Sequence, residues 1–103
     1  LFAYGSKRER LECLISETEK EMAGLKETVD EGDNEKANSW IHHIRSSWML
    51  IRAEQPLQEL YEVLHEGQAK EVIKASTRKV LEQGEKIIRL ARKELEKETW
   101  EES

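Results

Sequence analysis

Two adjacent histidines, His42 and His43, are the residues of this chain best suited to chemistry, and Arg45 and Ser46 follow them closely. A neutral imidazole is a good nucleophile toward phosphorus near neutral pH, provided that a phosphate donor can reach it. On a helix, a cation three residues further on can lie beside the phosphoryl oxygens, and a small residue at four keeps the approach open. The pattern therefore indicates a patch that can accept a phosphoryl group.

The two histidines point in different directions on the helix that their surroundings predict. Apolar residues recur at three- and four-residue spacing around them, and the apolar face centres among Trp40, Ile44 and Trp48. At about 100° per residue, His42 projects about 150° from that centre and His43 about 110°. His42 is the more outward-facing of the two, and both tryptophans are expected in or near the core.

A metal site at the histidines is not expected. Adjacent helical residues cannot turn toward one ion together, and neither His42 nor His43 has a histidine or carboxylate partner that forms a convincing ligand set. Glu35 cannot pair with either one in an ordinary His/Glu zinc arrangement. We therefore expect neither a metal ion nor a cofactor in this domain.

The chain reads as four amphipathic helices joined by short connections. They are predicted over about residues 6–30, 34–52, 56–66 and 69–97. Gly32, Pro56 and Gly67 fall at the breaks, while Gly84 lies inside the last helix and could mark a close helix approach. Short connections make neighbouring helices antiparallel, so the fold expected for residues 1–103 is an all-α, antiparallel up-and-down four-helix bundle in one domain.

The apolar stripes of these helices are expected to form the core, with Ile51 and Val72 among them. Cys13 is expected to be a small buried apolar residue on the first stripe. Met49 and Leu50 turn only partly toward the core, so two roles remain open for them. They either pack under a neighbouring helix or form an apolar docking surface.

Composition excludes several classes of function. The chain has 103 residues with 17 Lys+Arg against 22 Asp+Glu, and its net charge of -5 disfavours nucleic acid and anionic lipid as partners. No apolar run approaches the roughly 18 residues of a membrane span, so no direct membrane contact is expected. The single cysteine cannot close an internal disulfide, which fits a reducing, cytoplasmic setting.

The stretch from Leu25 to Leu64 resembles the histidine-containing phosphotransfer (HPt) domain of two-component phosphorelays. In that family, a second helix carries a histidine ten residues after the glycine of a Gly-Asp turn, which is the interval from Gly32 to His42. The run from His42 to Ser47 matches the family pattern of His, any residue, Leu or Ile, Lys or Arg, and two small residues.

The resemblance extends to both sides of this motif. Ile51 and Ala53 fall where the family has an apolar-Gly-Ala segment, and a leucine ladder follows in the next helix. The segment 14–18, Leu-Ile-Ser-Glu-Thr, is similar to the first helix of HPt domains fused to hybrid sensor histidine kinases, particularly those of Bacteroides-like bacteria.

The resemblance implies specific roles and partners. His42 would be the phosphoacceptor, Arg45 the phosphate-side cation and Ser46 the small residue at the docking surface, with His43 as a flanking side chain. The domain would be a phosphorelay intermediate without turnover of its own, monomeric when isolated. Its partners would be response-regulator receiver domains, which carry the Mg²⁺. The setting would be cytoplasmic, alone or as the cytoplasmic part of a membrane-anchored sensor kinase.

Three positions depart from the family pattern, and two other interpretations stay open. Ser46 and Arg52 stand where glycine is common, and Trp48 is bulkier than is usual at its place. The motif also resembles the phosphoacceptor box of histidine-kinase dimerisation domains, although Ser47 stands where that box has proline. A helical adaptor bundle, in which His42 is only a surface residue, is the third interpretation.

Overall fold

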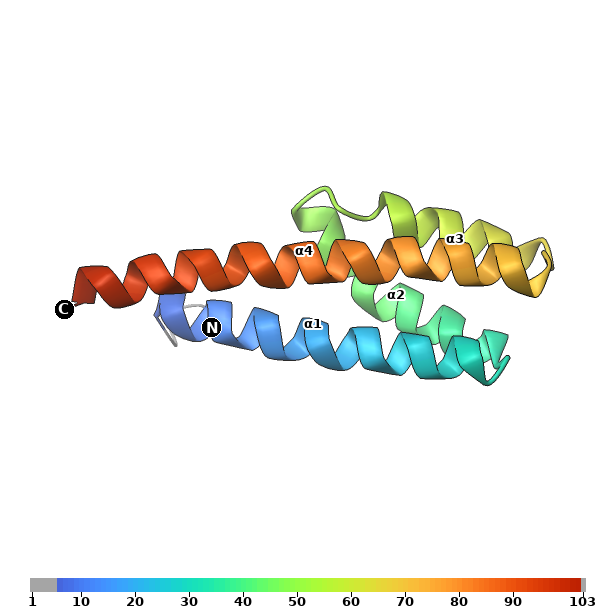
Figure 1. Cartoon of the computed structure of the whole chain (residues 1–103), viewed down its shortest axis with the longest axis horizontal. Helices are drawn as coiled ribbons and strands as arrows, with labels where there is room; N and C mark the ends of the chain where they lie inside the picture. Colours follow the sequence, from blue (N-terminus) through green and yellow to red (C-terminus); the bar gives the residue numbers. More distant parts are fainter. Residues whose placement is uncertain (1–5, 103) are drawn as a thin grey trace.

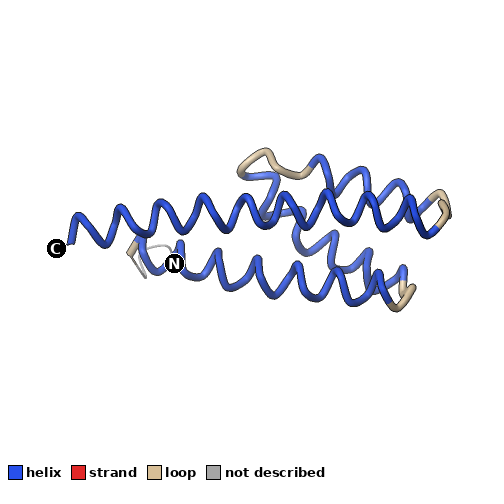
Figure 2. Tube along the Cα trace, viewed as in Figure 1, coloured by secondary structure: helices blue, strands red, loops and turns tan. Residues whose placement is uncertain are grey.

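The computed structural model describes the backbone of residues 6–102 and the side chains of residues 6–97. Four helices make up this part of the chain, and it contains no strand. They are α1 (Lys7–Asp30), α2 (Asn34–Leu50), α3 (Gln55–His65) and α4 (Lys70–Glu102). Short turns join them (Figure 2). The predicted all-α four-helix bundle is confirmed.

The helices form a closed ring in which each packs against its neighbours in the sequence and α1 also packs against α4. The two longest helices, α1 and α4, lie side by side along the long axis of the bundle (Figure 1). The bundle measures 52 × 25 × 22 Å, and α1 begins and α4 ends beyond the stretch covered by α2 and α3. No helix of residues 6–102 combines the length and apolarity needed to cross a membrane.

The helix ends follow from local chemistry. Ser6 Oγ accepts a hydrogen bond from the Glu9 N–H at 3.2 Å, which caps the start of α1. Pro56 occupies the first turn of α3, where its missing N–H costs nothing. Gly32 and Gly67 follow α1 and α3 with φ angles of 74° and 68°, which a residue with a Cβ rarely adopts.

One predicted helix end was close and another was wrong. α2 ends at Leu50, two residues before the limit predicted near residue 52, because Arg52 adopts a left-handed φ of 55° that takes it out of the helix. α4 continues to Glu102 rather than ending near residue 97, and residues 98–102 contain neither the glycine nor the proline that would stop it.

The core draws buried residues from all four helices, and Trp48 is its largest fully buried side chain. Trp40 is partly buried and packs against this core, as predicted. Three other burial predictions were wrong. Ile51 is 54% exposed because it follows the end of α2, Val72 is 41% exposed because it lies beside the buried stripe of α4, and Cys13 is exposed on the outer side of α1.

Two glycines let helices approach closely. A Cβ on Gly84 of α4 would lie 2.5 Å from Met22 Sδ of α1, so the close approach predicted at Gly84 is confirmed. A Cβ on Gly24 of α1 would lie 2.3 Å from Cζ2 of Trp40, whose indole ring covers that glycine. The second contact fixes the spacing of α1 and α2 beside the histidines.

Candidate functional site

His42 lies midway along α2 and is exposed to solvent, as are Arg45 and Ser46 one turn further on. Buried Ile41, Ile44 and Trp48 anchor the opposite face of the same helix in the core. The His42 ring makes no hydrogen bond with any other residue of the described chain, and Arg45 forms no ion pair there. An imidazole and a guanidinium, both open to an incoming group, therefore share one rigid surface.

The hydroxyl of Ser46 does not obstruct the surface beside His42. Its Oγ donates a hydrogen bond to the backbone carbonyl of His43 at 3.2 Å. The hydroxyl is thus folded back along the helix, which is a common arrangement for helical serines. The surface beside His42 stays open at this position.

An aromatic pair on α3 flanks His42. The ring of Tyr61 meets the His42 ring edge to face, with centroids 6.0 Å apart and an interplanar angle of 68°. His65, one helical turn beyond Tyr61, stacks on the same tyrosine at 6.0 Å and 9°. Edge-to-face contacts of this kind favour one ring orientation. Tyr61 therefore restricts how the His42 imidazole can turn.

His43 lies in a different environment, in the groove between α2 and α1. Its Nε2 is 3.2 Å from Oε2 of Glu21 on α1, and its ring meets Trp40 edge to face at 6.1 Å. The His43 side chain is 61% exposed, whereas only 7% of the Glu21 side chain is. We did not expect either histidine to have a carboxylate partner that forms a convincing ligand set, and α1 supplies His43 with such a neighbour through packing.

Glu21 is a nearly buried carboxyl, and the positive groups around it offset only part of the cost of burying its charge. Burial raises its pKa, which the neighbouring Glu17 raises further, while His43 and Lys20 act in the opposite direction. The net shift is upward, so the loss of solvent outweighs the attraction of the nearby cations. Ligand atoms of Glu17, Glu21 and His43 all lie within 4.8 Å of one another.

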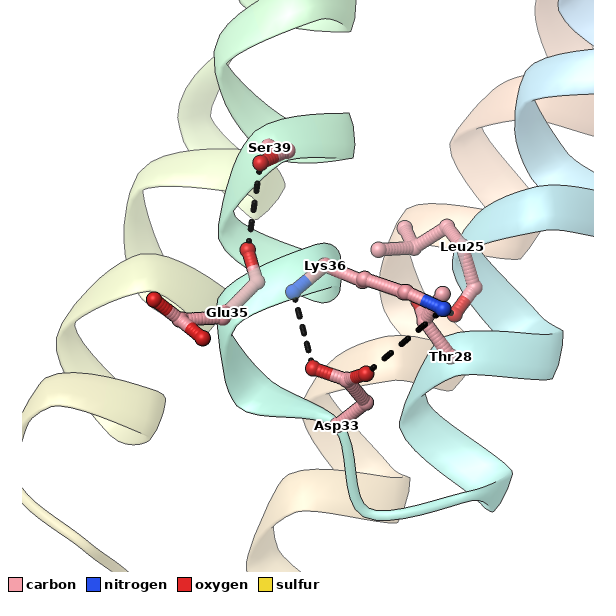
Figure 3. Close-up of polar contacts among 6 residues, drawn as sticks. All are labelled: Leu25, Thr28, Asp33, Glu35, Lys36 and Ser39. Atoms are coloured by element: carbon pink, nitrogen blue, oxygen red, sulfur yellow. Dashed lines mark hydrogen bonds and ion pairs between the residues drawn. The ribbon is translucent and has the colours of Figure 1, made fainter.

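The N-terminus of α2 is held by its own polar contacts (Figure 3). Asp33 Oδ1 accepts a hydrogen bond from the Lys36 N–H at 3.1 Å, and Asp33 Oδ2 lies 3.9 Å from Lys36 Nζ. Ser39 Oγ donates to the Glu35 carbonyl at 3.2 Å, and the Glu35 carboxylate points away from this cluster. The cap fixes where α2 begins and hence which residues face outward.

Beyond Ser46, the exposed surface continues as apolar residues at the end of α2. Met49 is exposed and Leu50 is 87% exposed. These two side chains therefore do not pack under a neighbouring helix, and their role in a docking surface stays a prediction. They follow the exposed patch of His42, Arg45 and Ser46 along the same helix.

Sequence reasoning missed Tyr61 as a neighbour of His42, and it missed His65 and Glu21 altogether. The spacing of Tyr61 and His65, four residues apart on a helix, could have shown that their rings meet. Nothing in the sequence sets which turn of α1 faces His43.

Comparisons with known proteins add no identification: no protein-family model matches the chain, and neither a curated protein nor a solved structure matches it significantly.

Proposed function

We propose that this domain is a phosphorelay intermediate of the HPt type, which accepts a phosphoryl group on His42 from the aspartate of a receiver domain and passes it to another receiver domain. The observation that carries the proposal is the His42 imidazole itself, exposed midway along a helix whose other face is anchored in a four-helix core. The motif from Gly32 to Ser47 supports the same conclusion.

The chemistry requires little more than this surface. A receiver that carries an aspartyl phosphate and Mg²⁺ docks over His42, and Nε2 attacks phosphorus. The new N–P bond forms as the O–P bond breaks, and the electron pair of that bond stays on the receiver's carboxylate. Arg45 is placed to steady the phosphoryl oxygens, since this transfer depends mainly on positioning and charge neutralisation. The phosphoramidate then passes to the next receiver by the reverse step.

The neighbours of the two histidines favour His42 over His43 as the acceptor. The His43 Nε2 lies 3.2 Å from a Glu21 oxygen, so the carboxyl group occupies the approach to that nitrogen and its negative charge would repel a phosphoryl group. The His42 ring instead meets the Tyr61 ring in an edge-to-face contact. It has no hydrogen-bonding partner to displace among the described residues.

The number of helices weighs against a histidine-kinase dimerisation domain. Such a domain is a helical hairpin that completes its bundle by dimerising, whereas residues 6–102 form four helices in one chain. Light scattering separates the two cases, because a monomer agrees with the HPt proposal and a stable dimer with the kinase hairpin.

The proposal is tested by phosphotransfer. A panel of receiver domains is phosphorylated with acetyl phosphate and Mg²⁺, then mixed with the domain, and the phosphoryl group is followed by intact mass. We expect a label that is lost in acid and stable in base, that is absent from His42→Ala, and that is retained in the matched variants His43→Ala and His65→Ala. A lack of label from every receiver would support a non-catalytic adaptor bundle instead. A label that persists in His42→Ala would show that another residue accepts the phosphoryl group and would overturn the assignment of His42.

A further inference from the structure

We propose that the groove between α1 and α2 binds one divalent zinc ion through Glu17, Glu21 and His43. Oxygen atoms of the two carboxylates and a ring nitrogen of His43 lie within 4.8 Å of one another, and all three residues line a pocket of about 370 Å³. The site lies on the side of α2 away from Tyr61. It does not depend on the phosphotransfer function.

The donor types suit zinc. Zn²⁺ accepts both imidazole nitrogen and carboxylate oxygen as ligands, and a site with three protein ligands leaves the fourth position to water, whereas Ca²⁺ and Mg²⁺ prefer oxygen alone. At ligand distances near 2.1 Å, a tetrahedral ion holds its ligand atoms about 3.4 Å apart. The 3.2 Å between His43 Nε2 and Glu21 Oε2 already has nearly this spacing. The exposed Glu17 side chain can close the remaining gap by turning about its own bonds.

The charges of the groove favour a cation beside Glu21. Glu21 is nearly buried, and Glu17 lies one turn earlier on α1, with a carboxylate oxygen within 4.8 Å of the ligand atoms of Glu21 and His43. Two carboxylates thus lie beside His43, Glu21 nearly buried and Glu17 exposed, and the two lysines that also line the pocket, Lys20 and Lys36, are exposed. A divalent ion would neutralise both carboxylates at once.

Packing holds two of the three ligands in place before any ion binds. Glu21 is fixed by its burial against the bundle, and the His43 ring meets the edge of Trp40 at 6.1 Å. Trp40 is itself held over Gly24, where no Cβ intervenes. Ligands that packing already holds in position need little rearrangement to bind an ion.

Isothermal titration of the whole domain with ZnCl₂ tests the proposal. We expect one ion per chain, a midpoint of thermal unfolding that rises with zinc, and binding at least about ten-fold weaker in His43→Ala and Glu21→Gln. The matched variants His65→Ala and Glu27→Gln, which alter an exposed histidine and an exposed carboxylate outside the groove, should bind as the parent does.

Cobalt gives a second readout that a merely structural effect of these substitutions would not reproduce. Co²⁺ bound in a tetrahedral site with a nitrogen ligand absorbs visible light strongly, and this band should appear in the parent and vanish in His43→Ala. Stoichiometric binding that survives both His43→Ala and Glu21→Gln, or no binding by the parent at micromolar protein concentrations, would overturn the assignment.

Discussion

Gly24 makes a sharp test of how α1 and α2 pack beside the histidines. In Gly24→Ala, the added Cβ would lie 2.3, 2.5 and 2.9 Å from three carbons of the Trp40 indole, where ordinary contacts begin near 3.4 Å. The ring would have to move by about 1 Å, and overpacking of this kind costs up to roughly 3 kcal/mol. Alanine returns about 1 kcal/mol through its better helix propensity. We expect a net loss of about 2 kcal/mol.

Gly84→Ala is the matched control. Its Cβ would meet Met22 at 2.5 Å from Sδ and 2.7 Å from Cγ, which are atoms of a flexible, unbranched side chain. Met22 can adopt another rotamer, so the gain of about 1 kcal/mol in helix propensity should offset most of the cost. Gly84→Ala should therefore be near neutral.

Urea denaturation followed by circular dichroism measures both variants, with thermal unfolding as a check. At about 4 °C per kcal/mol for a domain of this size, Gly24→Ala should lower the melting temperature by about 8 °C. In a Trp40→Leu background, the same substitution should become neutral or stabilising, because the ring that it strikes is gone. The reasoning is refuted if Gly24→Ala is as stable as Gly84→Ala, or if the Trp40→Leu background leaves its cost unchanged.

Four further predictions concern other positions. Arg52→Gly should stabilise the domain by about 0.5–1 kcal/mol in urea denaturation. Relief of the left-handed φ is worth about 1–2 kcal/mol, and the greater freedom of glycine in the unfolded chain offsets part of this gain. Arg52→Ala keeps a Cβ at this position and should show no such gain. Burial raises the pKa of Glu21, so the contribution of this carboxyl to stability is present below about pH 4 and is lost as the pH rises through the raised pKa. Glu21→Gln should therefore be more stable than the parent at pH 7, and the difference in stability between the two proteins should vanish near pH 4. Asp33→Ala removes the cap of α2 and should cost about 1 kcal/mol in the same assay. Arg45→Ala should slow phosphotransfer about ten-fold, worth about 1.4 kcal/mol in the transition state, with an unchanged circular dichroism spectrum.

Local chemistry explains why most of the fold could be predicted from the sequence. The four helices follow from apolar spacing, and their limits from residues that act within a few positions of themselves, such as Ser6, Asp33 and Pro56. Exceptions arise where one residue overrides its neighbours. Arg52 takes a conformation that side chains disfavour, and this ends α2 before Ile51 can join the core.

The features of the candidate site that depend on α2 alone could be predicted from the sequence, but its contacts with other helices could not. The directions of His42 and His43 follow from 100° per residue, and the exposure of His42 is observed. The partner of His43 depends on the register between α1 and α2, which the contact of Gly24 with Trp40 helps to fix. No local sequence pattern shows that Gly24 and Trp40 meet, so the position of Glu21 beside His43 could not be predicted from the sequence.

The adjacent histidines therefore have different capacities because a turn of about 100° directs them to different neighbouring helices. His42 faces an aromatic ring on α3, which orients the imidazole without taking up a nitrogen. His43 faces a nearly buried carboxyl on α1, which takes up Nε2 and disfavours an anionic group while favouring a cation. Glu21→Gln should therefore weaken zinc binding at His43 and leave phosphotransfer to His42 unchanged. Parallel loss of both would show that the two histidines work as one site.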